Sequence, residues 1–258
     1  MTHASLCTGV AGFDIAASMM GWQNIFQCEI EPFCQTVLKY YFPECELFSD
    51  IKTSNFKKYA NAIDVISAGF PCQPFSVAGK RKGTSDDRHI WSEVYRAICE
   101  VQPRWFVGEN VPEILTIERG VVFKGIKSDL ENAGYQVFKP VEIPACAVDA
   151  EHRRDRVFII ANSDSERCKR RKHTDKSKKT IQNNVGKLHS WNTWNKRKNN
   201  LSQSPVCRGN YGLSGKLDGI TFPSWRRKSI EAFGNAVVPQ VVLQIFKAIE
   251  KVELINNQ

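Results

Sequence analysis

Cys72 is the side chain best suited to covalent chemistry. It stands between Pro71 and Pro74 in Gly69-Phe-Pro-Cys-Gln-Pro-Phe-Ser76, directly after the apolar run 63–68. Because proline fixes its backbone φ angle, the loop is stiff and the thiol keeps one direction. A thiolate is a strong nucleophile, and its pKa falls beside a helix start or positive groups. We predict that Cys72 is a nucleophile, and we interpret most of the other eight cysteines as structural thiols.

A glycine-containing turn and two carboxylates suggest a nucleotide site. Gly9-Val-Ala-Gly12 separates an apolar run from a helical pattern, where a bare backbone and free N–H groups can approach a ligand. Glu29 ends the next apolar run, where a carboxylate can accept hydrogen bonds from ribose hydroxyls. Asp50 follows Leu47-Phe48 and could bind an adenine amino group. Each signal is weak alone, since such turns are common and loop carboxylates are usually solvated. The sequence has no Walker phosphate loop, which favours a cofactor without a triphosphate.

The elements that must position these residues alternate along the first 161 residues. Apolar runs predict strands, and helical spacing of apolar residues predicts helices between them. The predicted strands are 4–8, 24–28, 47–48, 63–68, 105–107, 136–143 and 156–161; the predicted helices are 12–20, 32–41, 87–101, 121–132 and 238–253. This alternation predicts a doubly wound α/β sheet with ligands at the carboxyl ends of its strands.

The positive charge is concentrated in one polar segment. The chain has 258 residues and a net charge of +9, but residues 166–198 hold twelve Lys and Arg against two acidic residues. That segment carries +10, which leaves −1 for the rest. We therefore predict a domain formed by residues 1–161 and 230–258, interrupted by a short, irregular, partly disordered basic insert at 162–229. Its first half, 167–184, is either a nucleic-acid contact surface or a disordered linker.

Several protein classes are disfavoured. No run approaches ~18 consecutive apolar residues, so we expect no transmembrane helix. The first residues lack the pattern of a signal peptide. The nine scattered cysteines form no CxxC pair, which favours reduced thiols in the cytoplasm and no metal site.

Five segments and one pair of carboxylates, in order, resemble the cytosine-carbon-5 DNA methyltransferases. Gly69–Ser76 resembles the family's catalytic loop, and Glu29 and Asp50 stand where its cofactor carboxylates belong. The other matching segments are Leu6-Cys-Thr-Gly-Val-Ala-Gly-Phe13, Gly108-Glu-Asn-Val-Pro112, His152-Arg-Arg-Asp-Arg156 and Gly234-Asn-Ala-Val-Val-Pro239. The chain departs from the family pattern at Cys7, Ala11, Ile30, His89-Ile90 and His152, which puts cofactor affinity in question, and no segment matches the family's penultimate motif.

The resemblance implies a Rossmann-like methyltransferase fold and a reaction. The expected reaction is methyl transfer from S-adenosylmethionine to carbon 5 of a flipped-out cytosine in a short duplex DNA sequence, leaving S-adenosylhomocysteine. Cys72 would attack carbon 6, Glu109 would hydrogen-bond ring nitrogen 3, and Arg154 and Arg156 would lie beside the base, with Arg156 on oxygen 2. The base that removes the carbon-5 proton stays open, and water is one candidate.

The resemblance also implies the binding residues, with 162–229 as the target-recognition region. The expected cofactor set is Cys7, Gly9, Gly12, Phe13, Glu29, Ile30, Asp50, Ile51, Gly69, Pro71 and Asn235. The expected DNA set is Gln73, Ser76, Lys80, Arg81, Lys82, Arg167, Lys169, Arg170 and Arg171, whose cations would neutralise phosphates.

Other functions stay open. An RNA (tRNA) cytosine-5 methyltransferase would use the same scaffold, and a catalytically silent DNA-binding relative would need a lost catalytic group. A nicotinamide dehydrogenase would leave the Pro-Cys loop unexplained. The leading hypothesis is a prokaryotic or phage modification enzyme, monomeric and cytoplasmic, with double-stranded DNA as partner, no membrane contact, and a cognate restriction endonuclease, where one exists, acting separately.

Overall fold

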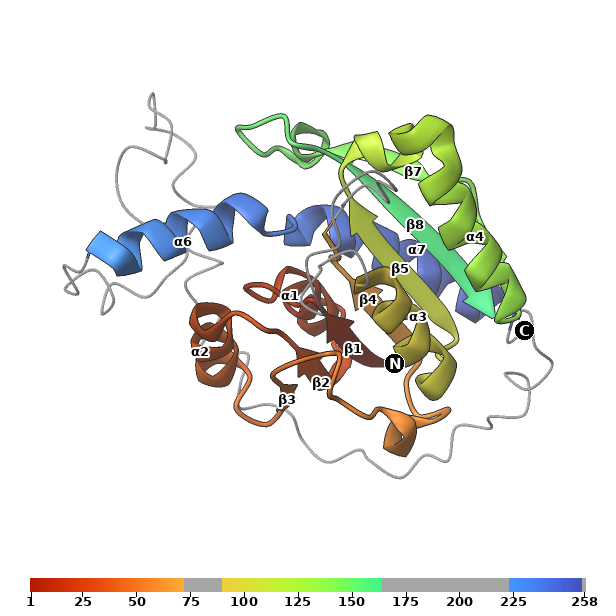
Figure 1. Cartoon of the computed structure of the whole chain (residues 1–258), viewed down its shortest axis with the longest axis horizontal. Helices are drawn as coiled ribbons and strands as arrows, with labels where there is room; N and C mark the ends of the chain where they lie inside the picture. Colours follow the sequence, from red (N-terminus) through yellow and green to blue (C-terminus); the bar gives the residue numbers. More distant parts are fainter. Residues whose placement is uncertain (72–89, 164–222, 257–258) are drawn as a thin grey trace, which may run out of the picture. The chain divides into compact units, whose positions relative to one another are not determined.

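The structure is a computed structural model that describes residues 1–71, 90–163 and 223–256 (Figure 1). Its described strands form one eight-stranded sheet in the order β3-β2-β1-β4-β5-β8-β6, with β7 paired to β8. The strands are β1 (Thr2–Leu6), β2 (Gln23–Cys28), β3 (Glu46–Phe48), β4 (Val65–Ala68), β5 (Trp105–Asn110), β6 (Tyr135–Val137), β7 (Val141–Pro144) and β8 (Asp155–Ser163).

One strand of the sheet, β8, runs against all of its neighbours. Strands β3, β2, β1, β4 and β5 run parallel to one another. Strand β8 runs antiparallel to β5, β6 and β7. The carboxyl ends of the five parallel strands and the amino end of β8 therefore meet at one edge.

Helices cover both faces of the sheet. They are α1 (Gly12–Met19), α2 (Pro32–Tyr41), α3 (Ile90–Val101), α4 (Val121–Asn132), α6 (Pro223–Asn235) and α7 (Pro239–Asn256), with short 3-10 turns η1 (Lys57–Tyr59), η3 (Pro112–Leu115), η4 (Ile117–Gly120) and η5 (Ala145–Val148). Alternate residues of β5 show the two layers: buried Phe106 packs with α3 and α4, whereas Trp105 and Val107 pack with α1 and α7. The predicted doubly wound α/β fold is confirmed.

Helix α7 is fixed to the sheet by polar as well as apolar contacts. Val242 and Phe246 are fully buried, and Trp22 stacks on Phe246 with ring centroids 4.7 Å apart. The indole N–H of Trp105 donates to Glu253 Oε1 at 2.8 Å. By length and composition alone, the stretch 226–255, which includes most of α7, meets the criteria for a membrane span, as core helices of globular proteins also do. The reason is that the α7 positions packed on the sheet are apolar.

The chain divides into two compact units by its internal contacts. One comprises residues 1–168 and 228–258, and the other comprises 169–227. The first unit holds the whole described sheet and α7. The predicted insert, 162–229, lies largely outside the described residues.

Local backbone conformation explains where the strand predictions differ. The predicted strand 4–8 ends at Leu6, because Cys7 has φ +50° and leaves the extended region. The single strand predicted at 136–143 is wrong: β6 and β7 are separate, with Phe138–Pro140 between them. Pro140 has no backbone N–H to give to a ladder. Predicted helices 32–41 and 121–132 are confirmed, while residues 87–89 of the predicted helix 87–101 lie outside the described part.

Candidate active site

The edge where the parallel strands end gathers most of the described site residues. Cys7, Glu29 and Gly69 directly follow β1, β2 and β4, and Glu109 lies at the end of β5. Ligands of open α/β sheets bind at this edge. Arg156 reaches the same edge because β8 runs antiparallel and begins there.

The loop after β1 is held by the carboxylate of Glu29. Gly9 has φ +60° and donates its N–H to Glu29 Oε2 at 2.6 Å. The other oxygen, Oε1, accepts the N–H of Glu31 at 2.9 Å. An ionised carboxylate has about four acceptor positions, so Glu29 keeps room for two further donors such as ribose hydroxyls.

Gly69 leaves a space between three groups of the site. A Cβ atom there would lie 3.6 Å from the carbonyl oxygen of Cys7, 3.8 Å from Glu109 Oε2 and 3.8 Å from Cε2 of Phe13. Three predicted residues from separate segments therefore surround one point. The bare backbone of Gly69 keeps it open.

Glu109 is a buried carboxyl beside two guanidinium groups. It is only 7% exposed, and its Oε1 lies 2.9 Å from Nε of Arg156 in an ion pair. This oxygen accepts no properly directed hydrogen bond, and Nε of Arg154 is likewise buried without an acceptor. Nη1 of Arg156 instead donates to the carbonyl of Asp155 at 2.7 Å, and Nη1 of Arg154 donates to the carbonyl of Gly234.

Burial is the main influence on the pKa of Glu109. Removal from water raises its pKa above the ordinary glutamate value, and the positive charges of Arg156 and Arg154 offset only part of that rise. Burial and the like charge of Arg156 lower the pKa of Arg154, while Glu109 raises it. A carboxyl with a raised pKa at the carboxyl end of a parallel strand is suited to donate a proton.

Asn110 holds the chain that leads to Cys72. Its buried Nδ2 donates to the carbonyl of Phe70 at 2.9 Å, and its Oδ1 accepts the N–H of Val111. Phe70 lies two residues before Cys72, which is outside the described residues, and Pro71 is the last described residue of this segment. The Glu109-Asn110 pair thus combines a buried carboxyl with an anchor for the predicted catalytic loop.

The C-terminal turn, residues Gly234–Val238, packs directly on Gly12, the first residue of α1. A Cβ atom on Gly12 would lie 2.4 Å from Val237 Cγ1 and 2.6 Å from the carbonyl oxygen of Val237. No real Cβ tolerates such distances, so only glycine fits. Residues 225 positions apart in the sequence are therefore in contact.

The remaining predicted cofactor residues differ in exposure. Ile30 is 63% exposed, whereas the Ile51 side chain is buried in the core and its carbonyl accepts a hydrogen bond from Arg96 at 2.6 Å. Asp50 is partly exposed and its Oδ1 accepts the N–H of Lys52 at 2.9 Å. Asn235 is exposed at the end of α6. The whole predicted DNA set lies outside the described residues: Gln73, Ser76, Lys80, Arg81, Lys82, Arg167, Lys169, Arg170 and Arg171.

The described cysteines near the site are poor nucleophiles. Burial raises the pKa of Cys28 and Cys34 to about 12 and raises that of Cys7 still further, with Glu29 adding to the rise in each case. A protonated thiol does not attack carbon. The described cysteines are free thiols, and the described residues contain no metal-binding group of three His, Cys, Asp or Glu side chains.

Sequence reasoning missed two contacts that shape the site. Asn110 stands in the Glu-Asn-Val segment, and that segment is the only local signal of its role as an anchor. Val237 belongs to the matching segment Gly234–Pro239, but nothing in the sequence indicates its contact with Gly12. A buried polar network also supports the loop after β1. Thr8 Oγ1 donates to the carbonyl of Cys28 at 3.2 Å, and Ser5 Oγ lies 2.9 Å from Thr8 Oγ1.

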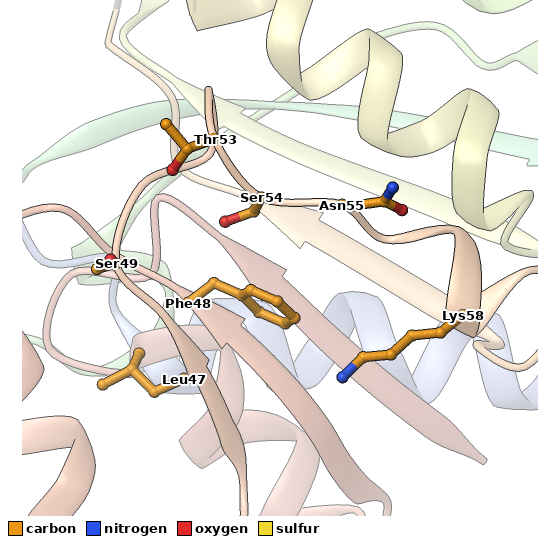
Figure 2. A pocket seen from close by; sticks show the side chains of 7 residues that line it. All are labelled: Leu47, Phe48, Ser49, Thr53, Ser54, Asn55 and Lys58. Carbon is orange, nitrogen blue, oxygen red and sulfur yellow. The ribbon is translucent and has the colours of Figure 1, made fainter.

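A hollow lies beside the carboxyl end of β3, at the edge of the sheet (Figure 2). The long side chain of Lys58 extends toward Phe48 in Figure 2, with Nζ 5.4 Å from the ring centroid. That ammonium is paired with Glu46 at 2.5 Å. The hollow is lined by Leu47, Phe48, Ser49, Thr53, Ser54, Asn55 and Lys58. It borders the Asp50 loop but contains none of the predicted cofactor residues.

The fold and the edge residues combine a Rossmann-like sheet with a buried carboxyl beside two guanidinium groups. A model of the C-5 cytosine-specific DNA methylase family matches residues 1–211, and the chain belongs to that family.

Known proteins agree with this assignment. The chain is 31% identical over 162 residues to the type II methyltransferase M.Eco47II of Escherichia coli, covering 62% of this chain and 39% of that protein. It is 33% identical to the type II methyltransferase M.HpaII of Haemophilus parainfluenzae, covering 62% of this chain and 45% of the relative. The chain thus spans less than half the length of these relatives.

Solved structures share the fold. A protein described as a DNA modification methyltransferase, encoded within an E. coli prophage, matches with a TM-score of 0.54 and 24% identity, covering 63% of this chain and 47% of that one. Dnmt2 methyltransferase of S. pombe matches with a TM-score of 0.53 and 19% identity, covering 64% and 52%.

Proposed function

We propose that this chain transfers a methyl group from S-adenosylmethionine to carbon 5 of a cytosine flipped out of a short duplex DNA sequence. The observation that carries this proposal is the buried Glu109 carboxyl, which pairs with Arg156 at 2.9 Å. Glu109 lies on β5, and the neighbouring strand β4 leads to Cys72. Family membership supports the same reaction.

Covalent catalysis accounts for these residue types. Carbon 5 of cytosine is a poor nucleophile, and attack of the Cys72 thiolate on carbon 6 forms an S–C bond and makes the ring an enamine. Negative charge develops on the ring as that bond forms. The protonated Glu109 donates to ring nitrogen 3, and its other oxygen accepts from the exocyclic amine. Arg156 donates to oxygen 2 and stays charged throughout.

Release completes the reaction after carbon 5 is methylated. The carbon-5 proton leaves to a base, the electron pair of that C–H bond re-forms the ring double bond, and the S–C6 bond breaks to return the thiolate. Water is one candidate for that base.

The residues of the edge fit S-adenosylmethionine. When bound, it supplies the electrophilic methyl group that carbon 5 accepts. Glu29 retains acceptor positions for ribose hydroxyls, exposed Ile30 is free to cover an adenine, and Gly69 keeps a space open beside Glu109. Cys7, Gly9, Gly12, Phe13, Asp50, Ile51, Pro71 and Asn235 complete the proposed set.

DNA binding is assigned to the basic segments. Gln73, Ser76 and Lys80–Lys82 would close over the flipped base, and Arg167, Lys169, Arg170 and Arg171 would contact phosphates within the target-recognition region 162–229. The similarity to type II methyltransferases supports a role as a modification enzyme. We propose that it is monomeric and cytoplasmic, with any cognate restriction endonuclease acting separately.

Transfer of labelled methyl groups to duplex DNA and to tRNA, side by side, tests the proposal. Mapping at base resolution should place 5-methylcytosine at one repeated DNA sequence. Label in tRNA alone would contradict the proposal and favour the RNA alternative. Label in neither nucleic acid, with cofactor bound, would also contradict it and favour a catalytically silent relative.

A further inference from the structure

Arg154 lies between the catalytic pair and the C-terminal turn. Its Nη1 donates to the main-chain carbonyl of Gly234, 80 positions away in the sequence. Its Nε is buried and has no acceptor. Its backbone is fixed as well, because the carbonyl of Arg154 accepts the N–H of Ala145 at 3.1 Å. The guanidinium is therefore held by its neighbours rather than freely directed at a ligand.

On one side, Arg154 acts on Glu109. The charges that face Glu109 are Arg156, at 2.9 Å, and Arg154, and both favour its ionised form against the effect of burial. Arg156 and Glu109 also influence Arg154, in opposite directions. A shift of the Arg154 guanidinium would therefore change the field at the carboxyl.

On the other side, the turn bound by Arg154 packs on the cofactor loop. Gly234 lies at the end of α6, and Val237 follows three residues later, between α6 and α7. Val237 packs so closely on Gly12 that a Cβ there would lie 2.4 Å away. Gly12 follows Ala11, whose φ of +71° shows how tightly this loop is wound. A ligand that displaces the Gly9–Gly12 loop must therefore also displace the Gly234–Val238 turn, or the turn will oppose the movement.

We infer that Arg154 is a positioning residue that links the Gly234–Val238 turn to the Glu109–Arg156 pair, so that occupation of the Gly9–Gly12 loop by cofactor changes the state of Glu109. This inference rests on the proposed function. It gives the two arginines different roles. Arg154 holds Glu109 and the C-terminal turn in place by binding the main chain of that turn, whereas Arg156 contacts the base.

Titration of Glu109 in the full chain, with and without S-adenosylhomocysteine, tests the link without turnover. The side-chain carboxyl carbon is followed by ¹³C NMR and assigned by its absence in Glu109→Gln. In the wild-type protein, the ligand should shift the midpoint. Arg154→Met should raise the midpoint in the free protein, abolish the ligand-induced shift and weaken ligand binding about 5-fold or more, the usual lower range of coupling between sites.

Arg153→Met is the matched control. Arg153 is the neighbouring residue of the same type, but its side chain is 83% exposed and pairs with Asp155 at 3.0 Å. It should leave the midpoint, the shift and the ligand affinity unchanged. Val237→Ala perturbs the link from its other end and should reduce the ligand-induced shift even though Arg154 is intact, which keeps the test decisive should Arg154→Met fold poorly.

The outcomes separate the two proposals. Ligand binding with the same Glu109 shift in wild type, Arg154→Met and Val237→Ala would overturn the link and leave the proposed function standing. Failure of the wild-type protein to bind the ligand would overturn the proposed function and the link together. An equal effect of Arg153→Met and Arg154→Met would overturn the specific role of Arg154.

Discussion

Gly12→Ala adds one methyl group at the contact between the cofactor loop and the C-terminal turn. The new Cβ would lie 2.4 Å from Val237 Cγ1 and 2.6 Å from the carbonyl oxygen of Val237. A side chain can rotate away, but a carbonyl oxygen moves only with its turn. Gly12 is the first residue of α1 and has no positive φ, so the substitution tests packing rather than backbone strain.

The expected loss of stability follows from two opposed effects. Overpacking of a tight contact costs about 1–3 kcal/mol. Alanine in a helix is favoured over glycine by about 0.5–1 kcal/mol. The net destabilisation should be about 1–2 kcal/mol, and at about 2–4 °C per kcal/mol for a chain of this size the Tm should fall by about 2–8 °C.

Thermal unfolding and calorimetric binding of S-adenosylhomocysteine measure the two consequences. Gly12→Ala should lower the Tm and weaken binding, because the turn must withdraw from the loop. The Gly12→Ala/Val237→Ala double variant should recover only part of the loss, since the carbonyl oxygen at 2.6 Å remains. Gly125→Ala is the control: Gly125 is exposed in α4 with no heavy atom within 4 Å, so the variant should gain stability and bind normally.

An unchanged Tm together with unchanged ligand binding in Gly12→Ala would refute this reasoning. Full recovery in the double variant would also contradict it, because it would assign the whole conflict to the Val237 side chain.

Three further substitutions test separate parts of the site. Asn110→Ala leaves the buried carbonyl of Phe70 without its donor, which should cost about 1–3 kcal/mol in denaturant unfolding and lower kcat more than it raises KM; an unaltered kcat would exclude Asn110 as the anchor of the Cys72 loop. Gly69→Ala places a Cβ at ordinary contact distances of 3.6–3.8 Å, so the Tm should hardly change while cofactor affinity falls; normal affinity would show that the cofactor does not use this space. Glu109→Gln should lower kcat by about 10²–10⁴-fold with DNA affinity retained. Because the folded pKa of Glu109 is raised, wild-type stability should be favoured below the ordinary glutamate value and decline as pH rises through the folded pKa, a dependence that the glutamine variant should lose in denaturant melts at several pH values.

Sequence signals predicted an element well where the signal lay within the element itself. Pro32 begins α2 where its missing N–H is harmless, and the apolar spacing of 121–132 gives α4. The failures are conformational. Cys7 adopts φ +50° and shortens β1, and no local pattern indicates that a cysteine will do so. Pro140 separates β6 from β7, a signal that was present in the sequence but overridden by the apolar run.

The sequence indicated which residues belong to the site, but it did not indicate which of them are in contact. The carboxyl-end rule anticipated that Glu29 and Gly69 would share an edge. The meeting of Glu109 and Arg156 depends on the antiparallel direction of β8, which periodicity does not reveal. Long-range partners are still less accessible: nothing near Arg154 in the sequence indicates that it binds the carbonyl of Gly234.

Covalent trapping tests the central claim most directly. DNA carrying 5-fluorocytosine at the mapped target has no carbon-5 proton to lose, so the S–C6 bond formed by Cys72 should persist. The wild-type chain with S-adenosylmethionine should give a protein–DNA product that survives denaturation, and Cys72→Ser should bind the DNA but give none. A product from Cys72→Ser, or no product from a wild-type chain that methylates the unfluorinated target, would contradict the mechanism.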